Sequence, residues 1–162
     1  EASKKITYLN SNHDNFLTRW LSGPSHMWRL HRNYADAVEL QLYRAKTGKH
    51  PIIKLLDLES FPNVKFIPES ASYYVGKVHV RHGHEGLLGA RVGFITSAKT
   101  YNFFVQGHLH SPAVYRNAAM AGLTSKLDAE YSIGASNWLH ANVLIQPDNS
   151  VQLLNIIRGV WK

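Results

Sequence analysis

The sequence has no cysteine, no long apolar run and few acidic residues relative to basic ones. Without cysteine, the chain can form neither a disulfide bond nor a thiolate-rich structural zinc site. No stretch reaches the roughly 18 apolar residues expected of a membrane-spanning helix, and the first residues, EASKK, lack the apolar segment of a signal peptide. We therefore expect a soluble, cytoplasmic protein with no membrane partner.

The shortage of acidic residues leaves the chain strongly basic. Eighteen Lys and Arg face eleven Asp and Glu, so the net charge is +7 with neutral histidines and the pI is about 9.7. Such an excess favours polyanionic partners, because neutralising phosphates releases counterions, although it carries no information about base sequence. Nucleic acid is therefore the partner class that this charge makes most plausible. The alternative is that an acidic remainder of a longer polypeptide balances this charge.

Apolar patterning indicates one mixed α/β domain over residues 1–162. The 162 residues are 44% hydrophobic, which is enough for one packed core. Helical spacing predicts a helix containing Phe16 and Leu21 that stops at Gly23-Pro24. A second apolar stripe, Ala35 to Ala45, predicts another helix ended by Gly48. β-like composition predicts strands at residues 5–9, 63–67, 73–80 and 102–105. Alternation predicts a strand at 138–146, and residues 151–157 return as its partner after a turn at Pro147-Asp148-Asn149.

Three polar clusters follow predicted strands, where loops are expected to begin. They are Asn12-His13-Asp14, His82-Gly83-His84 and Gly107-His108-Leu109-His110. Active sites of layered α/β folds usually lie at such strand ends. If the backbone continues extended, His108 and His110 point to one side and offer two imidazoles to one place, as two neighbouring metal ions require. The alternative for this tetrapeptide is a surface turn.

In this order, the clusters resemble the third, fourth and fifth signature blocks of the calcineurin-like metallophosphoesterases, a superfamily of dinuclear phosphatases and nucleases. The resemblance covers residues 6 to about 112. It implies an α/β fold in which this chain is the C-terminal portion of a two-sheet β-sandwich flanked by helices, with a helical insertion at about residues 22–70. Phage-type DNA nucleases belong to the family, but no motif assigns the chain to one of them.

The resemblance also implies roles for single residues. Asn12, His82 and His108 match ligands of the second metal, and His110 matches a ligand of the first. His13 matches the histidine that protonates the leaving oxygen or stabilises the transferring phosphoryl group, and Asp14 the carboxylate that orients it. The implied cofactors are two divalent ions, with manganese favoured and iron, zinc or nickel as alternatives. His84 matches no residue with a role that transfers.

The chain departs from the family pattern in two places. Ser11 stands where the family usually has glycine, and the early Asp-x-His and Gly-Asp blocks, which supply three ligands of the first metal, do not occur. We therefore expect a C-terminal portion of a longer polypeptide, whose N-terminal portion is its partner in forming the site. By itself, the chain is expected to be inactive or to bind one metal weakly.

The expected activity of the parent protein is metal-dependent hydrolysis of phosphodiester bonds, with a DNA nuclease favoured. Two cations roughly 3.5 to 4 Å apart can hold the phosphate and neutralise developing charge. Two rivals stay open. The first is a phosphomonoesterase or cyclic-nucleotide phosphodiesterase of the same fold, and the second is a non-catalytic binding or assembly module. The sequence does not indicate an oligomeric state.

Overall fold

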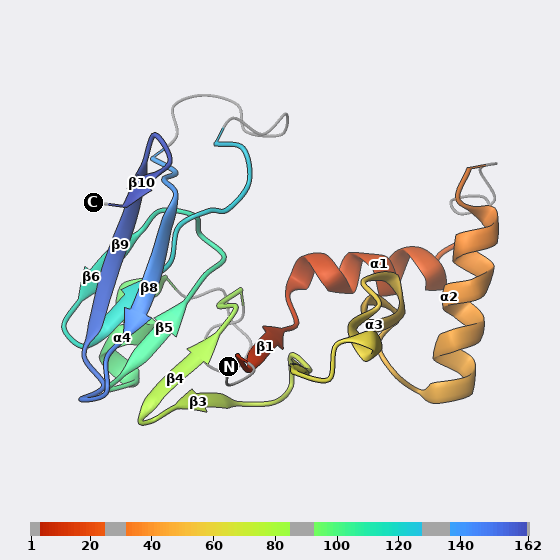
Figure 1. Ribbon diagram of the computed structural model, residues 1–162, viewed down its shortest axis with the longest axis horizontal. Coiled ribbons are helices and arrows are strands. Elements are labelled where there is room, and N and C mark those ends of the chain that lie inside the picture. The colour runs from red at the N-terminus through yellow and green to blue at the C-terminus, as the bar shows by residue number, and fades with distance from the viewer. Residues whose placement is uncertain (1–3, 25–31, 85–92, 128–136, 162) are drawn as a thin grey trace. The chain divides into compact units, whose positions relative to one another are not determined.

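A computed structural model describes residues 4–24, 32–84, 93–127 and 137–161 of the chain (Figure 1). The chain divides into two compact units, residues 1–70 and residues 71–162. The expectation that all 162 residues form a single domain stays a prediction. Among the described residues, no helix is long and apolar enough to cross a membrane.

The first unit (residues 1–70) is built on two parallel strands, β1 (Ile6–Leu9) and β2 (Val64–Ile67), with Ile6 opposite Val64. Parallel strands need a long crossover connection. Here the connection contains the helices α1 (Asn12–Ser22), α2 (Tyr34–Thr47) and α3 (Pro51–Leu55) and the short 3₁₀ helix η1 (Leu58–Ser60). Both predicted strands and both predicted helices are confirmed. The described part of the expected insertion at 22–70 is largely helical, but it also contains β2. Residues 25–31 of the insertion lie outside the described ranges.

The buried face of α2 differs from the predicted stripe. Its buried residues are Ala37 and Leu40, which pack with Leu21 of α1, whereas Val38 and Leu42 are 41% and 50% exposed. Apolar residues occur on more than one face of this helix, so periodicity alone could not select the buried one. Contact with α1 decided it. The predicted stop is confirmed, because Gly48 ends the helix in the left-handed region at a φ of 69°.

The second unit (residues 71–162) contains two sheets. The larger has the strand order β3-β4-β5-β7-β6, in which β4, β5 and β7 are parallel and both edge strands are antiparallel. The smaller is antiparallel, with the order β10-β9-β8. The strands are β3 (Tyr73–Val75), β4 (Val78–Arg81), β5 (Phe104–Gln106), β6 (Ala113–Tyr115), β7 (Ala118–Met120), β8 (Ala141–Ile145), β9 (Val151–Ile157) and β10 (Val160–Trp161).

One predicted strand is wrong. Residues 73–80 form not a single strand but the hairpin β3–β4, which turns at Gly76 with a φ of 58°. That conformation favours glycine, and the N–H of Lys77 donates to Asn149 Oδ1 at 2.7 Å. The turn predicted at Pro147-Asp148-Asn149 is confirmed, since β8 and β9 pair as antiparallel neighbours on either side of it.

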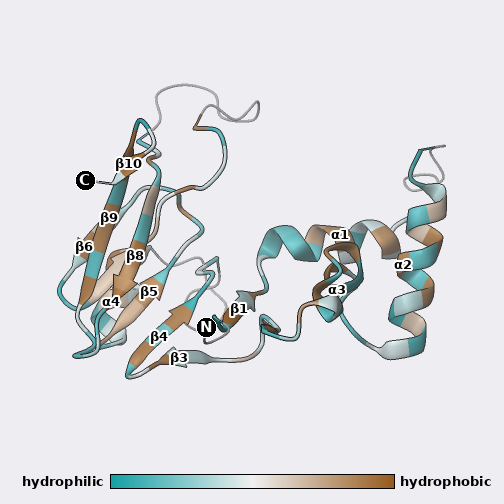
Figure 2. Ribbon diagram, viewed as in Figure 1, coloured by the Kyte–Doolittle hydropathy of each residue, from teal (hydrophilic) through white to brown (hydrophobic). Residues whose placement is uncertain are grey.

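The larger sheet is covered on both faces. Successive side chains of each strand point to opposite faces, so each strand contributes to packing on both sides. On β5, Phe104 packs against the helix α4 (Phe94–Thr100), which the sequence patterns did not predict. Its neighbour Val105 packs on the opposite face with Val143 and Val151 of the smaller sheet. Figure 2 shows hydrophobic and hydrophilic residues interleaved along β9. The fold is mixed α/β, as predicted.

Candidate functional site

His82 and His108 meet at the carboxyl ends of two adjacent parallel strands. Arg81 at the end of β4 pairs with Gln106 at the end of β5, and the N–H of Gly107 donates to the carbonyl of His82 at 3.0 Å. This register places His108 Nδ1 3.2 Å from His82 Nε2. The structure thus brings together two of the imidazoles that the resemblance assigns to one metal, and their role as ligands stays a prediction.

The backbone at His108 is strained, and the expectation of an extended Gly-His-Leu-His segment is wrong. The N–H of Leu109 donates to the carbonyl of Gly107 at 2.9 Å, and His108 between them has a φ of 71°. A three-residue hydrogen bond with positive φ at the centre is the rare γ-turn, which is unfavourable for a residue with a side chain. Strand β5 ends at Gln106, so strand alternation no longer governs where the histidines point.

His110 has a different set of neighbours. It also lies in the left-handed region, with a φ of 62°, and its ring meets the Trp138 ring edge-on at a centroid distance of 4.6 Å. The N–H of Leu139 donates to the His110 carbonyl at 3.3 Å. Trp138 therefore packs against the His110 ring.

His84 joins the histidine pair, although no family role pointed to it. Its ring centroid lies 5.5 Å from that of His82 and 5.9 Å from that of His108. Gly83 permits this arrangement, because its φ is 97° and an added Cβ would lie 2.9 Å from Cβ of the buried Gln106. The spacing His-Gly-His was visible in the sequence, but the buried glutamine beneath it was not.

Asn12, His13 and Asp14 form the first turn of α1 rather than a loop, which corrects the expectation for this cluster. Ser11 caps the helix, since its hydroxyl accepts from the Asp14 N–H, while the Asp14 carboxylate accepts from the Ser11 N–H at 2.8 Å. A capping box thus replaces the expected loop. The exposed His13 ring stacks on Phe16 at 5.4 Å.

The Asp14 carboxylate also accepts a hydrogen bond from the Tyr8 hydroxyl at 2.9 Å. Burial, together with this carboxylate, raises the pKa of Tyr8 to about 12. The contacts of Asp14 with Ser11 and Tyr8 hold the start of α1 in place. The side chains of Asp14 and His13 do not face each other, because adjacent residues of a helix point in different directions. Because Asn12 belongs to the first unit and the histidines to the second, their convergence stays a prediction.

His108 Nδ1 and His82 Nε2 are within hydrogen-bond distance of each other, and their separation also fits two ligands of one metal ion. Two nitrogens that each lie about 2.1 Å from an ion are roughly 3.0 to 3.4 Å apart at octahedral to tetrahedral angles. The 3.2 Å between His82 Nε2 and His108 Nδ1 falls in this interval. Across the described ranges, no group of three or more His, Asp or Glu side chains is placed to hold a metal.

Comparison with known proteins gives one distant relative. No family model matches the chain, and no solved structure matches it. Protein A1 of Escherichia phage T5 is 26% identical over 166 aligned residues, which are 93% of this chain and 29% of that protein. The chain thus spans less than a third of the length of this relative. The chain is therefore similar to one portion of a longer phage protein.

Proposed function

We propose that this chain is the C-terminal portion of a calcineurin-like metallophosphoesterase domain that hydrolyses phosphodiester bonds, with DNA as its substrate. The observation that carries the proposal is the His82–His108 pair, 3.2 Å apart at the ends of adjacent parallel strands. His82, His108 and Asn12 would bind the second metal and His110 the first. The remaining ligands would come from an Asp-x-His and a Gly-Asp in the N-terminal portion of the protein.

The layering of the second unit supports this assignment. Helix α4 covers one face of the five-stranded sheet, and side chains of β8 and β9 cover the other. Two stacked sheets flanked by a helix are what the C-terminal portion of the family's sandwich requires. Its site lies at strand ends, and the histidines follow β4 and β5.

Backbone strain at the same place is a second support. His108 and His110 both have positive φ, which costs an L-residue roughly 1 to 2 kcal/mol relative to the right-handed region. Strain of this kind persists when the surrounding structure imposes it, and it clusters at active sites and ligand sites. Glycine at position 108 itself would adopt this φ at lower cost. The retained imidazoles are therefore best explained by a functional requirement.

The residues of the chain have distinct tasks in the proposed reaction. When bound, two divalent ions supply Lewis-acid stabilisation of the charge that develops on the phosphate. His13, whose imidazole is exposed at the start of α1, donates a proton to the leaving oxygen, a step worth about 100- to 10,000-fold in rate. Asp14 positions His13 through the capping box. The net charge of +7 favours a polyanionic substrate.

Manganese binding to the 162-residue chain tests the proposal directly. Mn²⁺ is paramagnetic, so we expect it to broaden the imidazole NMR signals of His82 and His108 before those of His140, a partly buried histidine of the same unit that has no proposed metal role. H108Q should abolish the selective broadening and H140Q should leave it intact. Uniform broadening of all histidines, or selective broadening that survives H108Q, would overturn the metal assignment.

Activity requires the polypeptide extended at its amino end to include the missing ligands. With Mn²⁺, it should cleave DNA and bis-nitrophenyl phosphate, and H13A should lower the rate at least about 100-fold. Cleavage of nitrophenyl phosphate alone would favour the phosphomonoesterase. Absence of cleavage of any of these substrates would favour the binding module.

A further inference from the structure

A pocket in the first unit points to a second binding site. We propose that it binds one nucleotide of a DNA strand, with the phosphate at Arg44 and the base against the apolar wall at Phe66. Naming a DNA strand as the source of the nucleotide rests on the proposed function. None of the residues that line the cavity is a proposed metal ligand or a proposed catalytic residue.

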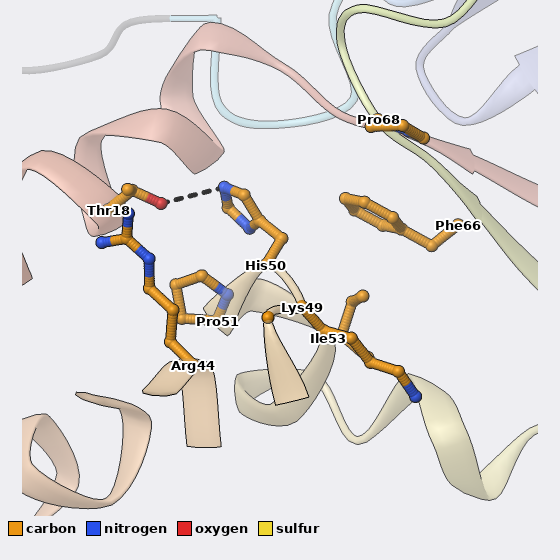
Figure 3. Close-up of a pocket in the computed structure, with 9 residues that line it drawn as sticks. Thr18, Arg44, Lys49, His50, Pro51, Ile53, Phe66 and Pro68 are labelled. Atoms are coloured by element: carbon orange, nitrogen blue, oxygen red, sulfur yellow. Dashed lines mark hydrogen bonds between the residues drawn. The ribbon is translucent and has the colours of Figure 1, made fainter. Parts of the chain in front are cut away.

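The cavity has the size of a small-molecule site. Its volume is about 410 Å³, within the roughly 300 to 1,000 Å³ typical of ligand pockets. It is lined by the middle of α1, the end of α2, the start of α3 and β2. Figure 3 shows the guanidinium of Arg44 and the hydroxyl of Thr18 at one end, the Phe66 ring at the other and the His50 imidazole between them.

His50 is fixed as a neutral donor inside the pocket. Its Nδ1 accepts a hydrogen bond from the N–H of Ile52 at 3.2 Å, so the proton of the neutral ring is on Nε2. Nε2 then shares its proton between Thr18 Oγ1 at 3.0 Å and Asn15 Oδ1 at 3.3 Å, and the shorter of the two bonds is to Thr18. Because a hydroxyl has one proton and two lone pairs, accepting this bond leaves the Thr18 proton to be donated to another oxygen. Burial lowers the pKa of His50, which favours the neutral form.

Arg44 is the cation best placed to receive a phosphate. One N–H of its exposed guanidinium donates to Ser22 Oγ at 3.0 Å, and the group has five N–H donors in all, in a planar fork that matches phosphate oxygens. Lys49 also lines the cavity, but its ammonium is paired with Glu59 at 2.5 Å and points away from the pocket in Figure 3.

The opposite wall is apolar and firmly held. Phe66 stacks with His50 at a centroid distance of 5.8 Å and with Tyr8 at 5.9 Å, so its ring is supported by residues of two other elements. Ile53 and Pro68 extend the apolar surface. A planar base can be desolvated there, while Thr18 and Arg44 offer donors to an anion. Phosphate alone would leave this wall uncovered, and a nucleoside alone would leave Arg44 without an anion.

NMR titration of the 162-residue chain in EDTA tests the site without any metal. The probes are deoxyadenosine monophosphate, deoxyadenosine, inorganic phosphate and an oligothymidylate of eight nucleotides. We expect the mononucleotide to shift the signals of Thr18, His50 and Phe66, and to bind more tightly than phosphate or the nucleoside. The oligonucleotide should shift the same signals at lower concentration. A shift with the mononucleotide but not with the oligonucleotide would overturn the strand assignment.

Matched variants on α2 separate the site from a general basic surface. R44Q and K46Q remove the same charge from exposed residues of one helix, but only Arg44 lines the pocket. R44Q should weaken mononucleotide binding about tenfold or more, because it removes charge-assisted hydrogen bonds, and K46Q less than about twofold. R44K, which keeps the charge but not the fork, should fall between them.

Equal losses in R44Q and K46Q, or absence of any localised shift, would overturn the pocket. H108Q should leave nucleotide binding unchanged, because its residue is a proposed metal ligand outside the pocket. Failure of the nucleotide site is thus distinguishable from failure of the metal site. Failure of the nucleotide site appears as unchanged mononucleotide binding of R44Q in EDTA. Failure of the metal site appears as selective Mn²⁺ broadening that survives H108Q.

Discussion

Replacing His108 by glycine should leave the second unit more stable than replacing it by alanine. Both substitutions remove the same imidazole and its 3.2 Å contact with His82 Nε2. They differ only in how well each residue tolerates the φ of 71° at the centre of the γ-turn. At most positions the order is reversed, because glycine gains conformational freedom in the unfolded chain. The sign of the difference therefore reports the backbone conformation.

The magnitude follows from two opposing contributions. An L-residue with left-handed φ costs about 1 to 2 kcal/mol, and glycine forfeits about 0.4 to 1 kcal/mol through the entropy of the unfolded chain. The net advantage of H108G over H108A is therefore about 1 kcal/mol in the free energy of unfolding. His140, whose φ is not positive, provides the control. There H140G should be less stable than H140A by about 0.5 to 1 kcal/mol.

Native-state amide hydrogen exchange is the appropriate assay because the chain has two compact units. The amides of Val105 and Ala119, in the buried centre of the larger sheet, report the opening free energy of the second unit itself. The expected result is a change of sign between the His108 pair and the His140 pair. If H108G proved less stable than H108A, His108 would not occupy a strained turn, and the argument from strain to function would fail with it.

Three further predictions concern glycine packing, helix capping and pH. G122A should destabilise the second unit by about 3 kcal/mol or more, because the new Cβ would lie 2.1 Å from the backbone oxygen of Leu139. G93A, whose new Cβ would have nothing within 4 Å, should cost less than about 1 kcal/mol, and similar urea midpoints for the two variants would contradict this. D14A should cost about 1 to 2 kcal/mol of stability by removing the capping box, and it should lower the pKa of Tyr8. D14N keeps an acceptor oxygen and should cost less, so equal losses of stability in thermal unfolding would count against the cap. Burial, followed by the charge of Arg81, lowers the pKa of His79 below its ordinary 6.5. On acidification the unfolded chain therefore binds a proton at this residue before the folded chain does, so the second unit should lose stability as pH falls below about 6.5. H79F should reduce the difference between the unfolding free energies measured in urea at pH 5 and pH 7, and an unchanged difference would refute the argument.

Local sequence signals predicted the elements that depend on local physics. Gly48 ends α2 because a left-handed residue closes the helix, and the alternation of Ala141, Val143 and Ile145 marks β8 because these residues share the face that packs inward. The capping box at Ser11 and Asp14 was equally readable, yet it was interpreted as a loop with chemistry. The helix α4 and the two hairpins within 73–81 and 113–120 were missed, because short elements lack the periodicity that separates strand from helix.

For the candidate site, the sequence by itself determined which side chains are available and that His82 and His108 follow strands. Tertiary structure alone decided that β4 and β5 are adjacent and parallel, which places the two nitrogens 3.2 Å apart. It also imposed the γ-turn at His108 and brought Arg44, His50 and Phe66 around one cavity. Strand order and pocket lining depend on contacts between residues far apart in the chain, and their energies appear in no local pattern of residues.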